Sequence, residues 1–345
     1  MSTIEDVAKL AGLSRTTVSR VINNHPYVSA TKKKLVHEAM EQLGYVPNSS
    51  ARSLRIQKTE TVAVFIPRVM NPFFSQLIET LEMAAAARNY QLIVCQTQYS
   101  AKKELNYLNL LKTKQVDGVI LASHENDWEL IEPYLQYGPI VLCNEFDNKA
   151  NVPMIYQDQV YGGYIATMHL IEQGNSLIGY CTGGHYSSVG TAREKGVKQA
   201  LKEAGLCFEE KFAFRNVYNI EHGRQVFHWI KGMNERPTAI FTGSDEVAAG
   251  IISEAKKYRW NIPVDLAVIG FDNQAITEIV EPNITTVHQP VTEMAEKAME
   301  VMYEKINSKD YKTKEIYQFP LKLIVRGSTV SNNLEKCSSI PKSIS

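Results

Sequence analysis

From Thr61 onward, apolar runs of strand length alternate with runs that have helical periodicity. The predicted strands are residues 62–67, 91–97, 118–123, 139–146, 154–157, 177–182, 212–218, 239–243 and 266–271. The predicted helices are 73–88, 102–112, 128–136, 160–173, 189–204, 221–231 and 246–258. This alternation predicts parallel sheets with helices on both faces. A body of about 270 residues is too long for one such unit, so we expect two doubly wound lobes, with a helix (291–307) and a strand (321–326) crossing back between them.

The first 23 residues have a different texture and predict two short helices. Thr3 and Asp6 have the spacing of a capping box. Gly12 ends the first helix, and Ser14 begins a second one after a turn of about three residues, which is typical of a helix-turn-helix. The inward positions predicted for the two helices are Ile4, Val7, Ala8, Ala11, Val18, Val21 and Ile22. A third helix from Ser29 to Gly44 closes a three-helix, all-α head.

The outer face of the second helix carries Arg15, Thr16, Ser19 and Arg20. Arginines and hydroxyls on one helix face suit the reading of a DNA major groove. The plainer alternative is a helical hairpin whose outer face is only solvated, and the helix pair alone does not decide between the two.

Charge is divided unevenly along the chain. The whole chain is neutral, but residues 1–58 hold nine basic and four acidic side chains, a net charge of +5, which leaves −5 for the rest. A basic head on an acidic body indicates a polyanionic partner for the head alone.

The connection between head and body is short. Pro47 forces an extended exit from the third helix. Residues 48–54 form a helix-capable run that is too short to be stable alone in water, which makes it a candidate for an element that orders only on binding. We therefore expect a helix-turn-helix domain at 1–47, a hinge helix and linker at 48–60 and a body at 61–330. A disordered tail, rich in Ser, Asn and Lys, is expected at 331–345.

Cysteine usage and the amino terminus indicate the compartment. Five scattered cysteines, mostly within apolar runs and without metal-ligand spacing, suit free thiols in a reducing cytosol. No secretory core or membrane-spanning stretch is visible in the sequence. We expect a cytoplasmic protein with no cofactor, no metal and no membrane partner.

Ordered motifs along the chain resemble the LacI/GalR family of bacterial transcription regulators. Those of the head and hinge are Ile4-x-Asp6-Val7-Ala8, Ala11-Gly12-x-Ser14, Thr17-Val18-Ser19-Arg20-Val21-x-Asn23, Gly44-Tyr45-x-Pro47-Asn48 and Ala51-Arg52-Ser53-Leu54. Those of the body include Asn71-Pro72-Phe73-Phe74, Asp245-x-x-Ala248-x-Gly250, Gly270-Phe271-Asp272 and Thr285-Thr286-Val287-x-Gln289-Pro290. The resemblance implies a repressor with lobes of the periplasmic-binding-protein type, which binds a palindromic double-stranded DNA operator as a homodimer.

The resemblance also implies roles for individual residues of the head. Arg15 and Thr16 match the principal base-reading pair, and Arg20 matches a further base or phosphate contact. Leu54 matches a hinge leucine that wedges between base pairs from the minor groove, although taken alone it is an ordinary apolar anchor. The complete set of expected DNA contacts is Thr3, Ser14, Arg15, Thr16, Thr17, Ser19, Arg20, Asn23, Tyr27, Asn48, Ala51, Arg52 and Leu54.

A small effector is expected in the cleft between the lobes. The class implied is a sugar, a sugar derivative or a nucleobase-like metabolite, and the expected contacts are Phe73, Phe74, Arg193, Tyr218, Asp245 and Asp272. Of the two phenylalanines, we expect one to face the core and one the cleft. Helix capping alone would explain Asp245, and Arg193 has a structural alternative. Residues 144–145 (Asn-Glu) and 184–192 depart from the sequence usual in the family, so the resemblance does not identify the effector.

Two other classes of function remain as alternatives. One is a doubly wound enzyme, but no Gly-x-Gly-x-x-Gly or phosphate-binding-loop motif follows a strand, and no nucleophile elbow is visible. The other is a cytosolic solute-binding module, which leaves the basic head and the hinge motif without a purpose. The direction of regulation and the choice between dimer and tetramer stay open.

Overall fold

The computed structural model describes residues 2–23, 25–46, 58–183, 188–308 and 311–330. The chain divides into two compact units, Met1–Thr59 and Glu60–Ser345. The predicted hinge helix and the tail lie outside the described residues.

The described residues of the first unit form three helices, α1 (Ile4–Leu10), α2 (Arg15–Ile22) and α3 (Ala30–Leu43). The capping box is present, because Thr3 N donates to Asp6 Oδ2 at 2.9 Å and Asp6 N donates to Thr3 Oγ1 at 3.3 Å. Gly12 ends α1 with φ of +64°, a conformation that suits glycine. The buried core consists of Val7, Ala8, Val18, Val21, Val36 and Ala39. The prediction of an all-helical head is confirmed.

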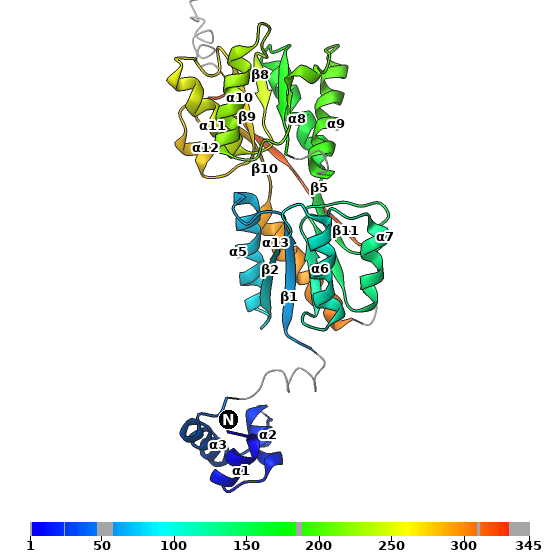
Figure 1. Cartoon of the computed structure of the whole chain (residues 1–345), viewed down its shortest axis with the longest axis vertical. Helices are drawn as coiled ribbons and strands as arrows, with labels where there is room; N and C mark the ends of the chain where they lie inside the picture. The colour runs from blue at the N-terminus through cyan, green and yellow to red at the C-terminus, as the bar shows by residue number, and fades with distance from the viewer. Residues whose placement is uncertain (1, 24, 47–57, 184–187, 309–310, 331–345) are drawn as a thin grey trace, which may run out of the picture. The chain divides into compact units, whose positions relative to one another are not determined.

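The second unit contains two lobes, each built on a six-stranded sheet (Figure 1). The sheet of the first lobe has the strand order β11-β5-β4-β3-β1-β2, and every pairing in it is parallel. Its elements are β1 (Thr61–Ile66), α5 (Pro72–Ala86), β2 (Gln91–Gln96), α6 (Ala101–Lys112), β3 (Gly118–Leu121), α7 (Trp128–Ile131), the 3₁₀-helix η1 (Glu132–Gln136), β4 (Ile140–Cys143) and β5 (Met154–Gln157). The later elements α13 (Val291–Asn307) and β11 (Ile316–Phe319) also belong to this lobe.

The sheet of the second lobe has the order β12-β10-β9-β8-β6-β7. Its elements are α8 (Gln159–Glu172), β6 (Ile178–Cys181), α9 (Ser188–Glu203), η2 (Glu210–Phe212), β7 (Ala213–Phe214), α10 (Ile220–Gly232), β8 (Ala239–Phe241), α11 (Asp245–Lys257), β9 (Ala267–Asp272), α12 (Ile276–Ile279), β10 (Thr285–His288) and β12 (Lys322–Ile324). The pairing of β10 with β12 is antiparallel. The chain therefore crosses between the lobes after β5, after β10 and after β11.

Helices cover both faces of each sheet, as doubly wound folds require. In β1, Val62 and Val64 pack toward α5 and α13, whereas Ala63 and Phe65 pack toward α6 and α7. In the second lobe, α8 and α9 cover one face of the sheet, and α10 and α11 cover the other. Because strands that are buried on both faces are continuous apolar runs in the sequence, their periodicity does not indicate which side chains face which layer of helices.

The structure differs from the expected elements in several places. The strand predicted at 212–218 is reduced to Ala213–Phe214, because η2 occupies Glu210–Phe212 at its start. The helix predicted at 128–136 splits into α7 and η1 around Pro133. Strands β10 and β11 were not predicted. Among the described residues, no helix is both long and apolar enough to cross a lipid bilayer.

Candidate functional site

The outer face of α2 presents the polar side chains predicted from the sequence. Arg15, Thr16 and Arg20 are exposed, while Thr17 and Ser19 are half-buried. The Arg15 Nη1 lies 3.6 Å from Glu5 Oε1, and the side chains of this pair are 69% and 66% exposed. An ion pair this exposed contributes at most about 1 kcal/mol to stability. Arg15 can therefore leave Glu5 for another partner at little cost.

Several of the other predicted DNA contacts are also used within the head. Ser14 Oγ accepts a hydrogen bond from Thr17 N at 3.2 Å and lies 2.9 Å from Thr17 Oγ1. Asn23 Nδ2 donates to Ser19 O, and Thr3 belongs to the capping box. Tyr27 is 90% exposed, an unusual position for an aromatic side chain. The remaining predicted contacts, Asn48, Ala51, Arg52 and Leu54, lie outside the described residues.

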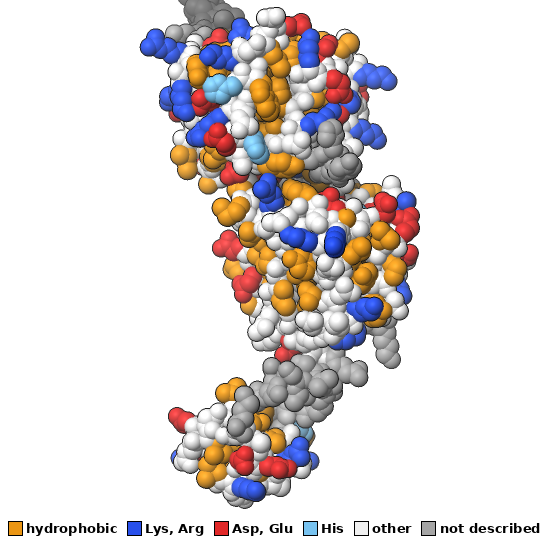
Figure 2. All heavy atoms as spheres, in the orientation of Figure 1, with side chains coloured by type: hydrophobic (Ala, Val, Ile, Leu, Met, Phe, Trp, Pro, Cys, Tyr) orange, Lys and Arg blue, Asp and Glu red, His pale blue; other side chains and the backbone are white. Residues whose placement is uncertain are grey.

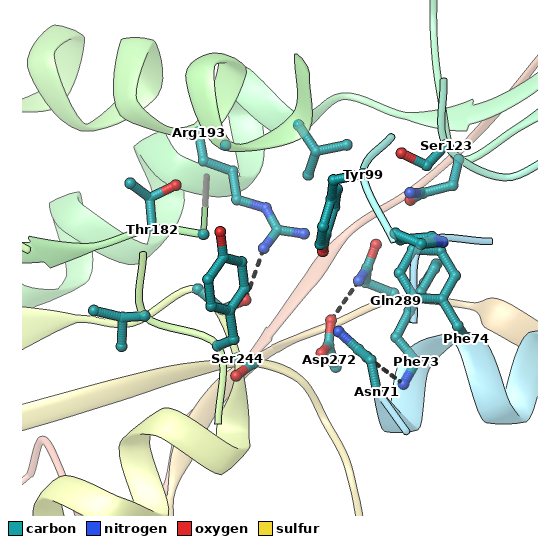
Figure 3. A pocket seen from close by; sticks show the side chains of 18 of the residues that line it. Asn71, Phe73, Phe74, Tyr99, Ser123, Thr182, Arg193, Ser244, Asp272 and Gln289 are labelled. Carbon is teal, nitrogen blue, oxygen red and sulfur yellow. Dashed lines mark hydrogen bonds between the residues drawn. The ribbon is translucent and has the colours of Figure 1, made fainter. Parts of the chain in front are cut away.

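The second unit holds a cavity at the carboxyl ends of the parallel strands of both sheets (Figure 3). Its open space, including the mouth, is about 750 Å³. Five of the predicted effector contacts line it, namely Phe73, Phe74, Arg193, Tyr218 and Asp272. A pocket of this size, aromatic with a few convergent polar groups, suits a small organic ligand.

Arg193 extends from α9 into the cavity (Figure 3). Its Nε donates to Gln159 Oε1 at 2.8 Å, and its Nη1 donates to the carbonyl of Gly243 at 3.0 Å. The guanidinium carbon lies 3.4 Å from the centroid of the Phe271 ring. Burial lowers the pKa of Arg193 and the charge of Asp272 opposes that shift, but an arginine remains charged in proteins.

Asp272 ends β9 with a φ of +104°, a strained value for a residue other than glycine. Its Oδ1 accepts from Gln289 Nε2 at 2.5 Å and its Oδ2 accepts from Gln274 Nε2 at 3.2 Å. Burial raises the pKa of this carboxyl to about 7, although Arg193 and the Gln289 hydrogen bond oppose the shift.

These polar side chains form one network across two of the interlobe crossings. Arg193 donates to Gln159, Gln159 Nε2 donates to Gln289 Oε1 at 3.4 Å, and Gln289 donates to Asp272. Gln159 begins α8 and Gln289 follows β10. A molecule that binds Arg193 and Asp272 therefore acts on the segments that join the lobes.

Aromatic side chains form the opposite wall. Phe73 and Phe74 meet edge to face with ring centroids 5.1 Å apart, at the start of α5, where Asn71 Oδ1 accepts from Phe73 N at 3.0 Å. Both phenylalanines line the cavity and both belong to the core cluster beneath it, so the expected division of roles between them does not occur. The rings of Tyr99 and Tyr218 lie 6.0 Å apart across the cavity.

Asp245 is not brought to the cavity. Its side chain is fully buried, with Oδ1 accepting from Thr286 Oγ1 at 2.6 Å and Oδ2 accepting from Gln274 N at 2.8 Å. Its Oδ1 also occupies the space beside Gly270 that a Cβ atom would fill. Burial raises the pKa of Asp245 well above its usual value. The residue holds the turn after β9 in place rather than facing a ligand.

Sequence reasoning missed other lining residues, among them Tyr99, Ser123, Glu145 and Gln289. They share one feature, because each follows the carboxyl end of a parallel strand, respectively β2, β3, β4 and β10. Ligands bind at these ends of parallel strands, so the predicted strands before Tyr99, Ser123 and Glu145 are a sequence signal for those three residues. Gln289 lacks this signal in the sequence, because β10 was not predicted.

Comparison with known proteins identifies the family. A family profile described as bacterial regulatory proteins, lacI family, matches residues 3–48, and one described as a periplasmic binding protein-like domain matches residues 167–329. The NTD biosynthesis operon regulator NtdR of Bacillus subtilis (strain 168) is 45% identical over 329 residues, which cover 95% of this chain and 100% of that protein. The chain belongs to the LacI family.

Other relatives of this LacI-family regulator cover nearly the whole chain as well. Catabolite control protein A of Priestia megaterium is 35% identical over 329 residues, 95% of this chain and 99% of its own. Among solved structures, the CelR–cellobiose complex is 27% identical with a TM-score of 0.68, and it covers 95% of this chain and 100% of its own. The lac repressor dimer bound to operator shares the fold, with a TM-score of 0.83 at 21% identity over 96% of this chain and 99% of its own.

The LacI-family chain is thus a DNA-binding transcriptional regulator with an effector-binding domain, and the fold predicted for it is confirmed. Membership of a family of regulators decides against the enzyme alternative.

Proposed function

We propose that this chain binds a two-fold symmetric DNA operator as a homodimer, with one α2 helix in each half-site, and represses transcription there. The observation that carries the proposal is the exposed face of α2, where Arg15, Thr16 and Arg20 stand on a helix whose inner face is fully occupied by the head's core. A helix of this kind fits the major groove.

Each side chain of the proposed interface has a distinct task. Arg15, at the first position of α2, has the fork geometry that pairs with the O6 and N7 atoms of guanine, and Thr16 contacts the neighbouring base. Arg20 contacts a base or a phosphate. The hydroxyl and amide groups of Thr3, Ser14, Thr17, Ser19, Asn23 and Tyr27 contact phosphates and sugars, which sets the register of the head without reading the sequence.

A homodimer is supported by apolar side chains on the surface of the body. Met83 on α5 is 66% exposed, Ile93 and Val94 on β2 are 39% and 41% exposed, and Ile279 on α12 is 79% exposed. Figure 2 shows hydrophobic side chains gathered over the lobe that carries α5 and β2. Exposed apolar surface of this kind is typical of a face that another protein covers, and a second copy offers a matching face.

The hinge couples this dimer to the DNA. We propose that residues 48–54 of both copies meet in the minor groove at the centre of the operator, where Asn48, Ala51 and Arg52 contact the DNA. Leu54 enters between base pairs and kinks the duplex. Two hinge segments reach the same groove only if the two bodies hold them at the correct spacing, so a change in the body controls the head.

The effector, in this proposal, is a small polyhydroxylated molecule in the cavity. Phe73, Phe74 and Tyr218 provide faces for a sugar or base-like ring, and Asp272 and Arg193 provide hydrogen bonds to its hydroxyls. The cellobiose complex of CelR and the glucose-bound LacI-family regulator of Lactobacillus casei support a sugar. Because Arg193 and Asp272 end a network that spans two interlobe crossings, ligand binding alters how the lobes meet.

Selection from a random double-stranded DNA library tests this function. Purified full-length chain should enrich a two-fold symmetric motif with half-sites about one helical turn apart, and the sedimentation of the complex should correspond to two chains on one site. Enrichment of an asymmetric half-site, or one chain on each DNA molecule, would overturn the dimeric operator.

Thermal-shift screening against sugars, sugar phosphates and nucleobases then tests the effector, and a hit must also change retention on the selected DNA.

A further inference from the structure

The effector cavity continues into a second compartment close to an interlobe crossing. This compartment has about 480 Å³ of open space and is lined by Phe146, Tyr156, Asp158 and other residues. The rings of Phe146 and Tyr156 are 4.7 Å apart and form an aromatic wall. Asn144, Glu145 and Val189 line both compartments, so they stand at the junction where a ligand would pass from one compartment to the other.

The charges around the two compartments do not balance. Among the described residues that line them, the acids are Glu145, Asp158 and Asp272, and the base is Arg193. Asp158 is occupied as the cap of α8, where Oδ1 accepts from Tyr161 N at 2.9 Å. Asp272 lies in the field of Arg193. Among the described lining residues, Glu145 is thus the acid that neither caps a helix nor lies beside Arg193.

Glu145 is 4% exposed and forms no salt bridge with any residue that the structure describes. Ser188 Oγ donates a hydrogen bond to its Oε2, and the Ser123 side chain also forms a hydrogen bond with this carboxyl. Burial raises the pKa of Glu145, Glu104 adds to the shift, and His124 opposes it. A buried carboxylate without a cation is costly for the folded state, and a residue that imposes such a cost is a candidate for function.

The neighbouring Asn144 adds a second unmet acceptor. Its Nδ2 lies 3.5 Å from the carbonyl oxygen of Ala122, which fixes the orientation of the amide because a carbonyl cannot donate. Its Oδ1 is buried and has no hydrogen-bond partner within the described part of the chain. Buried acceptors of this kind are rare in native proteins unless a ligand or water satisfies them.

The wall behind this junction is acidic too. Glu125 has a pKa raised to about 7 by burial and by the charges of Glu104 and Glu145. The carboxylate of Glu104 accepts hydrogen bonds from the backbone amides of Glu125 and Asn126. Neither Glu104 nor Glu125 is among the described residues that line the two compartments, so Glu145 is the glutamate of this wall that a ligand can contact.

We propose that the effector carries a protonated amine, and that Glu145 receives this ammonium group where the two compartments meet. The inference rests on the proposed function, because it names the chemical class of the effector in the same cavity. An ammonium group has three donors and no acceptor, so it matches a junction that offers carboxylate and amide oxygens. A hydroxyl would leave the carboxylate uncompensated. The aromatic walls and Asp272 favour an amine borne by a sugar ring.

Matched ligands test the amine. The full-length chain is titrated by calorimetry with glucosamine, glucose and N-acetylglucosamine, then with the three galactose counterparts, and with putrescine as an amine without a sugar. Within each sugar set, only the free amine is charged. We expect the amino sugars to bind and their neutral counterparts to bind at least about tenfold more weakly, as expected for the loss of a charged hydrogen bond.

Matched variants test the residue. Glu145→Gln should weaken binding of the amine about tenfold or more, while Glu125→Gln, which removes a carboxylate of the same wall that does not line the cavity, should leave affinity within about twofold. Equal binding of neutral and amino sugars, an unchanged Glu145→Gln variant, or an equal loss in Glu125→Gln would each overturn the inference. Binding of putrescine alone would support the ammonium site and reject the sugar as its carrier.

A third measurement needs no ligand. If Glu145 is kept for ligand binding at a cost to the fold, Glu145→Gln should melt at the same temperature as the parent chain or higher. A lower melting temperature would assign Glu145 a structural role through Ser188 and count against the inference, as would the absence of any response to the amines. Operator selection with the parent chain is unaffected by either result, so failure of the amine is distinguishable from failure of the regulator.

Discussion

At the scale of single residues, exposure and pairing separate side chains that bind from side chains that hold the fold. Arg15 and Asp245 are both charged residues at the first position of a helix. Arg15 is exposed and held by one weak ion pair, whereas Asp245 is buried and fully engaged with Thr286 and Gln274. Sequence position alone treats the two alike.

We predict that Arg15→Ala weakens operator binding by about 1–3 kcal/mol and relaxes the preference at one base position in each half-site. The loss follows from the bidentate contact that alanine cannot make. Binding of the variant to single-base variants of the operator measures the change. Lys34→Ala is the control, because Lys34 lies on α3 and pairs weakly with Glu38; it should leave the base preference unaltered. An unchanged preference in Arg15→Ala would remove this residue from base reading.

The raised pKa of Asp272 makes the stability of the fold depend on pH. Its folded pKa of about 7 lies above the ordinary aspartate pKa of 3.8, so the folded state binds more protons than the unfolded state between these values. The contribution of Asp272 to the free energy of unfolding therefore falls as pH rises from about 4 to 7, by up to about 4 kcal/mol. Asp272→Asn should lose less stability over this range in urea titrations. Parallel profiles for the parent and the variant would contradict the assignment.

At the scale of elements, close helix packing positions the cavity. Helices α8 and α9 approach so closely that a Cβ atom on Gly196 would lie 1.9 Å from the carbonyl oxygen of Val160. Arg193 stands on α9 about one turn before this contact. The approach of the two helices therefore fixes where the guanidinium enters the cavity.

We predict that Gly196→Ala destabilises the body by about 1–3 kcal/mol, because overpacking must push α9 away from α8. It should weaken effector binding as well, since Arg193 moves with α9. Gly232→Ala is the matched control, since a Cβ atom there has nothing within 4 Å; its stability should be unchanged or slightly raised. Urea unfolding and calorimetry measure both effects. If Gly196→Ala behaves like Gly232→Ala, the packing argument is wrong.

The elements also show how far the sequence allows prediction. The capping box of Thr3 and Asp6 is local, and so are the apolar runs that became β1 and β9, because all of their determinants lie within a few residues. Strand β11 was not predicted, because its residues alternate in exposure at a sheet edge and its partner β5 is about 160 residues away. Strand β10 lies within the motif Thr285-Thr286-Val287-x-Gln289-Pro290, which indicated the family but was not interpreted as a strand.

At the scale of the whole molecule, regulation requires two copies of the chain to act together. Head and body are separate compact units, and in the proposed assembly only the hinges connect DNA reading to the effector. A substitution in the hinge therefore tests the proposed assembly as a whole rather than one contact.

We predict that Leu54→Ala weakens binding to the selected operator by 10-fold or more, roughly the worth of 1–3 kcal/mol of lost wedge contacts, yet barely alters binding to random DNA. Non-specific binding depends on phosphate contacts and counterion release, which Leu54 does not provide. Competition assays at two salt concentrations measure both affinities. An equal loss on the operator and on random DNA would contradict the wedge.

By itself, the sequence determined the three-helix head, the doubly wound lobes and the family, because caps, apolar periodicity and ordered motifs are local features of the chain. The tertiary structure alone decided the cavity. It placed Glu145, Gln289 and Arg193 together from three elements far apart in the chain, and it withdrew Asp245 into the fold. The physical reason is that a binding site depends on burial and on partners brought by parallel strands and their crossings, and neither is a property of neighbouring residues.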